Sequence, residues 1–465
     1  MFDNGAFGRF RATFRGALLR PPEEGYDEAR RVWNGAIDRK PALIARCAGS
    51  DDVVVAVRFA REHDLPVSVR GGGHSIAGYG VCDGGLMIDL SLLKAVRVDP
   101  AARTVWAAGG LLWSELDRTT QPFGLATTGG VISHTGVGGL TLGGGLGHLM
   151  RRCGLTVDNL LAVDLVTAEG EQRRVDADTE PELFWGLRGG GGNFGIATAF
   201  QFRLHPVGPF VVGGPIFWPL DQAQEVLGFV DDYAADAPDE LGITLSVMPA
   251  PPTPFTSPAE FGKPVVALIL AWTGDPAEAD RVVAPLRAVG TPVGDGVRPI
   301  PYLALQSMLD GGAPHGRHYY WKAHRLPSLT GEVIDTFAAR IEGMTSPFSQ
   351  INGWAVGGAV SRVDETSTAV GDRAPGFEMS VTVGWPGTDP EPERHRVWVR
   401  DGWQALAPHA DGVYANFISD EGHAGLRAAY GQPRLDRLTA LKDRWDPANV
   451  FRLNANIPPS EGNTR

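Results

Sequence analysis

The sequence predicts an α+β protein in which short strands form sheets and helices pack on their outer faces. Glycine supplies 61 of the 465 residues, about 13% against ~7% in an average protein, and most of this excess lies before residue 215. Helical and alternating apolar patterns follow one another in that first part, and the amino-acid composition changes after it. A chain of this length is expected to form two domains, or three.

The glycine-rich part contains helices and strands in turn. Helices are predicted within 52–64, 112–124 and 181–188, and strands within 67–70, 85–91, 104–110, 159–171 and 195–207. In the second helix Leu112, Leu116 and Thr119 share one side, and Pro122 stops it. This mixture predicts an α+β domain that extends to about residue 210.

A second domain is predicted from about residue 215 to 405, where glycine clusters give way to tryptophan, proline and amphipathic segments such as 222–238. Its apolar run Val265–Trp272 is too short to span a bilayer and is expected to be a buried strand. The tail has a helix with an apolar stripe, and Asp446-Pro447 ends it. The stripe consists of Leu435, Leu438 and Leu441.

Charge and cysteine content exclude several classes of protein. The 42 basic and 54 acidic residues give a net charge of −12 without a basic cluster, which argues against nucleic acid or an anionic membrane as partner. Three widely spaced cysteines, Cys47, Cys82 and Cys153, favour neither a disulfide framework nor a zinc site, so a cytoplasmic protein is expected. The segment 8–20 is predicted to be a surface helix rather than a secretory signal. Oligomeric state is left open.

Three glycine-rich loops, at 70–75, 135–148 and 188–195, are the main functional signal. Glycine lets backbone N–H groups converge on an anion, so three such loops in one domain favour a long phosphate-bearing ligand, a dinucleotide, over tight turns alone. The G-x-G-x-x-G match that starts at Gly190 follows a helix and precedes a strand, which is the reverse of the Rossmann order.

Other motifs are excluded one by one. The Gly-Lys pair at 262–263 is followed by Pro264, so it is no Walker loop, and Ala77 breaks a nucleophile elbow at 73–77. His315 and His318 lack a clear third metal ligand, so no metal site is predicted. His74, which follows three glycines, either bonds backbone groups or faces the ligand.

Five segments together resemble the FAD-linked oxidases of the vanillyl-alcohol oxidase type, and among them the berberine-bridge-enzyme-like group. They are 41–91, 135–161, 182–200, 414–417 ("YANF") and 443–457 ("DRWDPANVFRLNANI"). The resemblance implies a PCMH-type FAD-binding domain of two subdomains at 1–210, with its core at about 37–208. It also implies a substrate domain at 211–408, an antiparallel sheet covered by helices, and a C-terminal segment at 409–465 that returns to the FAD domain.

By this resemblance His74 is bonded to the 8α-methyl group of FAD. Many relatives carry a second link from a cysteine four residues before the G-x-G-G turn, where this chain has Ile132. Cys153 stands where relatives have tyrosine. A single covalent link through His74 is therefore expected, with Cys153 a packing residue.

The resemblance also implies the remaining site residues. Tyr414 is the candidate base, with a purely structural role for its hydroxyl as the alternative, and Glu378 is a weaker catalytic candidate, with Ser380 beside it a poor base. The expected cofactor contacts are Arg70, Gly71, Gly72, Gly73, His74, Ser75, Tyr79, Thr135, Gly136, Gly138, Gly139, Gly143, Gly144, Gly145, His148, Gly192, Asn193, Gly195, Ile196, Tyr414, Asn416 and Asn454.

The implied activity is hydride transfer from a substrate C–H bond to flavin N5, with reoxidation by O₂ that releases H₂O₂. A small alcohol, such as a sugar or a natural-product hydroxyl, is the expected substrate. The alternatives are amine oxidation of the 6-hydroxynicotine oxidase kind, a dehydrogenase that is slow with oxygen, and a flavin carrier without turnover.

Overall fold

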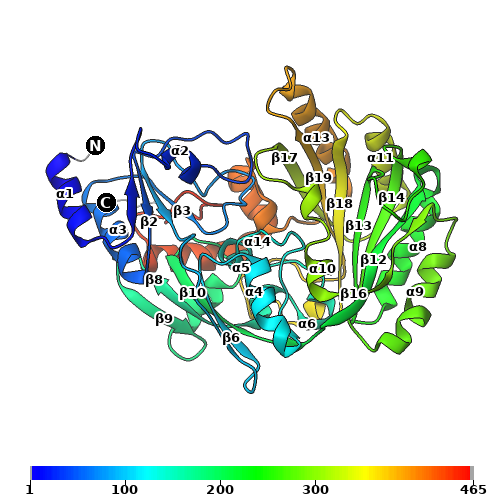
Figure 1. Cartoon of the computed structure of the whole chain (residues 1–465), viewed down its shortest axis with the longest axis horizontal. Helices are drawn as coiled ribbons and strands as arrows, with labels where there is room; N and C mark the ends of the chain where they lie inside the picture. Colours follow the sequence, from blue (N-terminus) through cyan, green and yellow to red (C-terminus); the bar gives the residue numbers. More distant parts are fainter. Residues whose placement is uncertain (1–2, 461–465) are drawn as a thin grey trace.

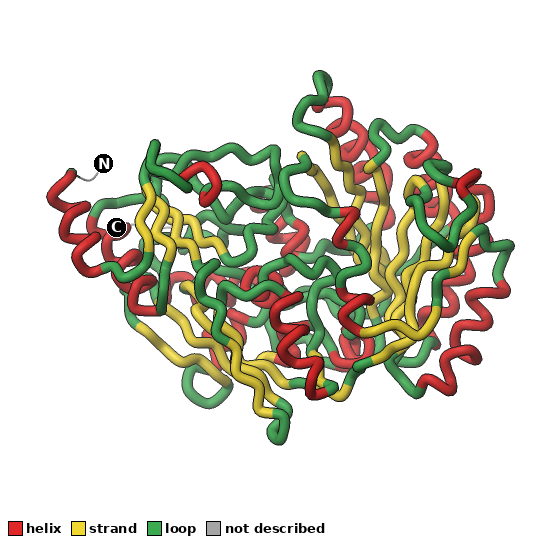
Figure 2. Tube along the Cα trace, viewed as in Figure 1, coloured by secondary structure: helices red, strands yellow, loops and turns green. Residues whose placement is uncertain are grey.

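The computed structural model describes residues 3–460 and confirms the α+β prediction (Figure 1). Two small sheets lie in the glycine-rich part, and one large sheet lies in the part that follows (Figure 2). The outermost residues of the predicted domains, 1–2 and 461–465, lie outside the described part, and the domain boundaries stay a prediction. Within 3–460 no helix is long and apolar enough to cross a membrane.

The first sheet has four strands in the order β1-β2-β4-β3, with β2, β3 and β4 parallel. They are β1 (Ala17–Leu19), β2 (Leu43–Arg46), β3 (Val67–Arg70) and β4 (Leu86–Asp89), accompanied by α1 (Asn4–Thr13), α2 (Tyr26–Ala29) and α3 (Ser50–Glu62). Helix α3 turns Val53, Val57 and Ala60 into the core, as their spacing predicts. Strand β3 delivers the chain directly into the first glycine loop.

The second sheet is antiparallel, in the order β5-β6-β10-β8-β9. Its strands are β5 (Val96–Asp99), β6 (Thr104–Ala108), β8 (Leu160–Val166), β9 (Gln172–Asp176) and β10 (Ile196–Arg203). The helices of this part are α4 (Trp113–Thr120), α5 (Val137–Leu142), α6 (Met150–Cys153) and α7 (Pro181–Leu187), and a short pair joins β7 (Leu125–Ala126) to β11 (His205–Pro206). The predicted strand at 159–171 is β8, and the turn that ends this segment leads into β9, with which β8 pairs as a hairpin.

Of the three residues predicted to share one side of the helix at 112–124, only Leu116 is buried. Helix α4 begins at Trp113, whose large indole is fully buried together with Leu116 and Thr120. Leu112 precedes the helix in extended backbone, and the hydroxyl of Thr119 bonds the carbonyl of Glu115 instead of facing the core. Burial of the larger apolar side chain therefore sets the inner side.

The third sheet has eight antiparallel strands in the order β15-β12-β14-β13-β18-β19-β17, with β16 paired to β12. The strands are β12 (Phe210–Pro219), β13 (Leu241–Pro249), β14 (Pro264–Trp272), β15 (Gly294–Asp295), β16 (Arg298–Pro301), β17 (His318–Leu326), β18 (Phe348–Val356) and β19 (Gly376–Trp385). The helices are α8 (Ala223–Asp236), α9 (Ala279–Ala288), α10 (Tyr302–Gln306), α11 (Gly331–Glu342), α12 (Ala359–Arg362) and α13 (Pro392–Leu406).

The two faces of this sheet differ. Met379, Val381 and Val383 of β19 pack into a core that α8, α9, α11 and α13 cover. Because side chains alternate along a strand, Glu378 and Ser380 lie on the opposite face. That polar face looks toward the glycine-rich part of the molecule.

The C-terminal segment packs back onto the glycine-rich part, as the resemblance implies. Helix α14 (Gly422–Trp445) bends at Gly431 and ends before Asp446, where the sequence predicts its end. Its leucine stripe is buried in the same apolar core as α4, α7 and β10.

Candidate functional site

The three glycine loops form one continuous surface. A Cβ on Gly72 would lie 2.3 Å from the backbone nitrogen of Gly136, so the first two loops touch through backbone alone. The carbonyl of Leu142 accepts hydrogen bonds from the backbone N–H groups of Gly189 and Gly191, which joins the second loop to the third. Loops that are far apart in sequence therefore build a single site.

Glycine is required at the centre of this surface. Gly144 and Gly145 have φ of 129° and 91°, values that L side chains rarely adopt. A Cβ on Gly145 would also lie 2.0 Å from the hydroxyl of Thr156. The second loop keeps its shape only without side chains at these positions.

Part of the site is lined by open space and by polar atoms without partners. A Cβ on Gly139 or Gly192 would meet no protein atom within 4 Å. The side-chain oxygens of the predicted cofactor contact Asn454 and of its neighbour Asn456 are buried and have no hydrogen-bond partner within residues 3–460. Buried acceptors of this kind are normally satisfied, so the chemistry of the site fits a ligand that carries hydroxyl or amino donors.

His74 is held by an aromatic stack. The indole of Trp33 stacks on the His74 ring at 4.9 Å between centroids and on the ring of Tyr319 at 4.0 Å. The backbone N–H of Trp33 donates to the carbonyl of Gly73 at 3.0 Å. Burial, with smaller effects of two neighbouring histidines, lowers the pKa of His74 well below its usual value, so the imidazole is neutral at pH 7.

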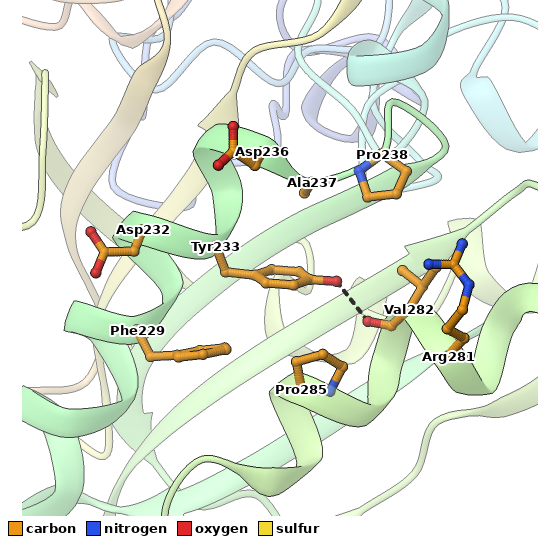
Figure 3. A pocket seen from close by; sticks show the side chains of 9 residues that line it. All are labelled: Phe229, Asp232, Tyr233, Asp236, Ala237, Pro238, Arg281, Val282 and Pro285. Atoms are coloured by element: carbon orange, nitrogen blue, oxygen red, sulfur yellow. Dashed lines mark hydrogen bonds between the residues drawn. The ribbon is translucent and has the colours of Figure 1, made fainter.

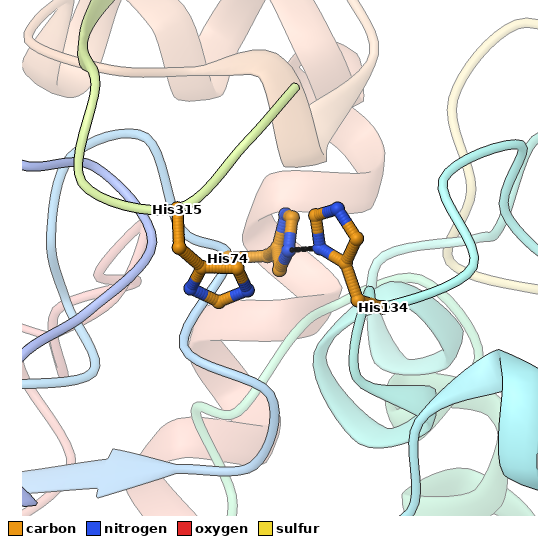
Figure 4. Close-up of side chains that lie close together, drawn as sticks. All are labelled: His74, His134 and His315. Carbon is orange, nitrogen blue, oxygen red and sulfur yellow. Dashed lines mark hydrogen bonds between the residues drawn. The ribbon is translucent and has the colours of Figure 1, made fainter. Parts of the chain in front are cut away.

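The two neighbours are His134 and His315 (Figure 4). His134 lies one residue before Thr135 in the second loop, and its Nδ1 is 2.7 Å from Nε2 of His74. His315 approaches His74 edge-on, with ring centroids 5.5 Å apart. The sequence predicts that His315 and His318 lack a third metal ligand; the fold brings His315 beside two other histidines from separate parts of the chain, and His318 is not in this cluster.

Tyr414 reaches the second loop from the C-terminal segment. Its hydroxyl oxygen accepts hydrogen bonds from the backbone N–H of Gly145 at 2.5 Å and from the side-chain amide of Asn416 at 2.9 Å. Burial raises the pKa of Tyr414 to about 12, and both hydrogen bonds act in the opposite direction. Donors aimed at the phenol oxygen stabilise its phenolate form.

Glu378 lies next to Tyr414 on the polar face of the large sheet. Burial raises its pKa to about 8, although the Arg325 charge and the backbone of Tyr414 lower it. Glu378 is therefore protonated at neutral pH, and its Oε2 has no partner among the described residues. A neutral carboxylic acid donates a hydrogen bond but is a poor base.

Other side chains around this face also have unpaired polar atoms. Ser246 of β13 donates to the side-chain oxygen of Asn352 at 2.8 Å, and Asn352 lies on β18, the strand next to that of Glu378. Within residues 3–460, polar atoms with no partner include both ring nitrogens of His148 and the indole nitrogens of Trp321 and Trp354. Burial lowers the pKa of His148 to about 4, so this ring is neutral.

The remaining predicted site residues lie in or beside the loops, with varied contacts. The guanidinium of Arg70 is bound by Asp89 and by two backbone carbonyls, so its side chain holds β3 rather than pointing into the site. Tyr79 donates to the carbonyl of Ser419 at 3.2 Å. Asn193 bonds the carbonyl of Ala455 and the N–H of Ile457, which ties the third loop to the C-terminal segment.

Cys153 and Ile132, the two residues on which the prediction of a single covalent link depends, have different surroundings. Cys153 packs beside an apolar cluster that contains Leu149 and Tyr302, and burial raises its thiol pKa to about 11. Ile132 lies in the second loop, where its carbonyl accepts a hydrogen bond from the N–H of Thr135. These surroundings agree with a packing role for Cys153.

Sequence reasoning missed Trp33, His134 and the indoles of Trp321 and Trp354. His134 could have been noticed, because it stands directly before the second loop. The others could not, because only the fold brings residue 33 and two strands of the large sheet to the site.

A separate hollow of about 460 Å³ lies between α8 and α9 (Figure 3). Phe229, Tyr233 and Pro285 contribute to its lining, and the Tyr233 hydroxyl donates to the carbonyl of Val282. It lies on the helix-covered side of the large sheet, and none of the predicted site residues lines it.

Comparison with known proteins identifies the family. Residues 41–176 match the family described as FAD binding domain, and residues 413–458 match berberine and berberine like. The chain is 32% identical to an FAD-linked oxidoreductase of Dictyostelium discoideum, covering 97% of this chain and 96% of the relative. It is 30% identical to (R)-6-hydroxynicotine oxidase of Paenarthrobacter nicotinovorans, covering 96% and 97%.

A solved structure agrees. The crystal structure of 6-hydroxy-D-nicotine oxidase from Arthrobacter nicotinovorans is similar with a TM-score of 0.85 at 27% identity, covering 96% of this chain and 98% of that one. The chain therefore belongs to the berberine-bridge-enzyme-like family of FAD-linked oxidases, with a PCMH-type FAD-binding domain.

Proposed function

We propose that the protein oxidises a CH–OH group of a small molecule. FAD is attached covalently through His74, and Tyr414 acts as the base. The observation that carries this proposal is the pair of donors on the phenol oxygen of Tyr414. A hydroxyl substrate must lose its O–H proton while hydride leaves carbon, so it needs a base at that point.

The described residues fit FAD. The glycine loops offer backbone N–H groups for the pyrophosphate, with open space at Gly139 and Gly192. The unpaired oxygens of Asn454 and Asn456 are suited to hydroxyl or amino donors of the cofactor. When bound, FAD supplies the hydride acceptor and passes electrons to dioxygen.

Tyr414 takes the substrate proton onto its phenol oxygen. Burial keeps the phenol protonated at neutral pH, with a pKa of about 12, and the donors from Gly145 and Asn416 favour the phenolate form that accepts this proton. Neutral Glu378 and the amide of Asn352 lie on the polar face of the large sheet, where they orient substrate through hydrogen bonds. The unpaired indoles of Trp321 and Trp354 stand opposite Thr382 and Glu378 on the same face, where they offer N–H donors.

Amine oxidation is the second candidate. It is favoured by the 30% identity to (R)-6-hydroxynicotine oxidase over nearly the whole length of both chains. An amine substrate that binds unprotonated loses hydride without a strong base. A dependence of flavin reduction on Tyr414 therefore separates the two candidates.

The test uses the purified protein and dioxygen consumption. Acid-precipitated protein should stay yellow, His74→Ala should release the flavin, and Cys153→Ala should leave the attachment and the spectrum unchanged. A panel of alcohols, sugars and amines is then added without oxygen, and bleaching of the flavin identifies substrates. Bleaching by amines alone would refute alcohol oxidation, and no bleaching by any compound would favour a flavin carrier. Reduction that oxygen reverses only slowly would indicate a dehydrogenase.

A further inference from the structure

The histidine cluster around His74 is more than a packing feature. Its three rings come from the first glycine loop, from the residue directly before the second glycine loop and from the loop before β17, and one nitrogen of each lies within 4.8 Å of the others. Figure 4 shows His74 and His134 facing each other across a hydrogen bond, while His315 lies to the other side.

A metal ion does not explain the closest pair. Two imidazole ligands at about 2.0 Å from a tetrahedral zinc have their nitrogens about 3.3 Å apart. The nitrogens of His74 and His134 are 2.7 Å apart, which is a hydrogen-bond distance. One ring therefore donates a proton and the other accepts it.

The proposed flavin link decides which ring donates: Nε2 of His74 is engaged with His134, so only Nδ1 of His74 is left for the flavin, and that nitrogen needs a free lone pair. Burial lowers the pKa of His134, and the charge and backbone of nearby Asp310 oppose this effect. The same Asp310 is fixed by its carboxylate, which accepts from the N–H and the hydroxyl of Ser133 at 2.7 and 2.6 Å. The proton between the two rings therefore lies on Nε2 of His74, and Nδ1 of His134 accepts it.

The tautomer of His74 follows. Nε2 of His74 must carry a proton to donate to Nδ1 of His134, which leaves Nδ1 of His74 with a lone pair. Trp33 holds the ring by stacking on it, so this lone pair has a fixed direction. His74 is therefore arranged as a nucleophile through Nδ1.

We propose that His134 is the positioning residue for flavin attachment: it fixes the reactive tautomer of His74 and accepts the proton that His74 loses. This inference rests on the proposed covalent link to His74. It adds a role for a residue that stands directly before the second loop and outside the large sheet.

The attachment step balances with dioxygen as oxidant. Nδ1 of His74 forms a bond to the 8α-carbon of FAD, and one C–H bond of that methyl group breaks with loss of a proton. Two electrons remain on the flavin, which is thereby reduced, and dioxygen takes them to give hydrogen peroxide. The Nε2 proton of His74 passes to Nδ1 of His134, which keeps the alkylated imidazole neutral.

The experiment measures attachment rather than turnover. Full-length protein is produced without flavin, FAD is added, and acid-stable flavin is followed over time by gel fluorescence and intact mass. His134→Leu and His134→Gln should bind FAD but attach it about 100-fold more slowly, the size of effect typical of a lost base. Added imidazole should restore part of the rate in His134→Ala. His315→Leu is the matched control and should attach FAD at the wild-type rate.

The outcomes separate the two proposals. Wild-type protein without acid-stable flavin would overturn the covalent link itself. A covalent wild type together with His134→Leu or His134→Gln at the wild-type rate would overturn the role of His134 alone. If both variants fail to bind FAD although their unfolding is unchanged, His134 serves binding and not attachment, which also overturns the inference.

Discussion

The backbone nitrogen of Gly145 lies 2.5 Å from the hydroxyl oxygen of Tyr414, across 269 positions of sequence. This contact joins the C-terminal segment to the second glycine loop and places a phenol beside the loop's backbone donors. Gly145 has a φ of 91°, and this backbone conformation directs its N–H at the phenol. The geometry of the loop and the acidity of the phenol are therefore coupled.

Removal of the Tyr414 hydroxyl should slow the reduction of the flavin without loss of FAD. In Tyr414→Phe we expect flavin reduction to slow about 100-fold or more, because a general base typically contributes at least that factor. Rapid mixing with substrate in the absence of oxygen measures the reduction rate directly. Tyr320→Phe is the control, since its hydroxyl bonds Asp420 away from the glycine loops. An unchanged rate in Tyr414→Phe would leave the hydroxyl with a structural role only.

The open space at Gly192 gives a prediction about the cofactor. A Cβ there meets no protein atom within 4 Å, so Gly192→Ala should leave the stability of the flavin-free protein unchanged. If FAD fills that space, its affinity should fall at least about ten-fold, since 1.4 kcal/mol of lost contact is a factor of ten. Titration with FAD in the His74→Ala background measures it. Gly8→Ala, equally open but inside α1, should leave the affinity for FAD unchanged, although alanine in a helix adds about 0.5–1 kcal/mol of stability. Equal affinities for both variants would place FAD elsewhere.

Periodicity and composition predict much of the fold but little of the geometry of the site. The apolar stripe of α3, the buried strand β14 and the end of α14 before Asp446 all follow from local patterns. The stack of Trp33 on His74 does not, because it depends on how a loop near residue 33 meets the first glycine loop. The protonation of Glu378 is also a tertiary effect, since burial outweighs the nearby Arg325.

Glu378 should make the stability of the protein depend on pH. Its pKa is about 8 in the folded chain against 4.5 for a free carboxyl group, so the folded state keeps a proton that the unfolded state loses. The stabilisation is complete below pH 4.5 and is lost as pH rises to about 8, a change on the order of 5 kcal/mol.

The measurement compares urea unfolding of the wild type and Glu378→Gln at several pH values. The stability of the variant relative to wild type should rise between pH 4.5 and 8 and then level off. Glu342→Gln, at the exposed end of α11, should show no such trend. A constant difference across this range would mean that Glu378 titrates normally in the folded protein.

The ion pair of Lys442 and Asp446 provides a prediction about the C-terminal segment. Nζ of Lys442 lies 2.7 Å from the carboxylate of Asp446, and neither side chain is exposed. The same nitrogen donates to the carbonyls of Asn193 and Phe451, so one buried ammonium links α14, the third glycine loop and the chain after the helix. In Lys442→Met these acceptors lose their donor and Asp446 keeps an unpaired buried charge. We expect a loss of about 3–5 kcal/mol in unfolding free energy.

The control for this ion pair is Lys263→Met. Lys263 pairs with Glu260 at the surface, with 59% of the lysine side chain exposed, so its removal should cost at most about 1 kcal/mol. Hydrogen exchange locates the effect: amides near Phe451 and Ile457 should lose protection in Lys442→Met, while those of the eight-stranded sheet should keep it at low denaturant. Uniform loss across both parts would show that the pair stabilises the whole molecule and not the attachment of its C-terminal segment. Equal costs for the two lysine variants would show that burial adds nothing to this pair.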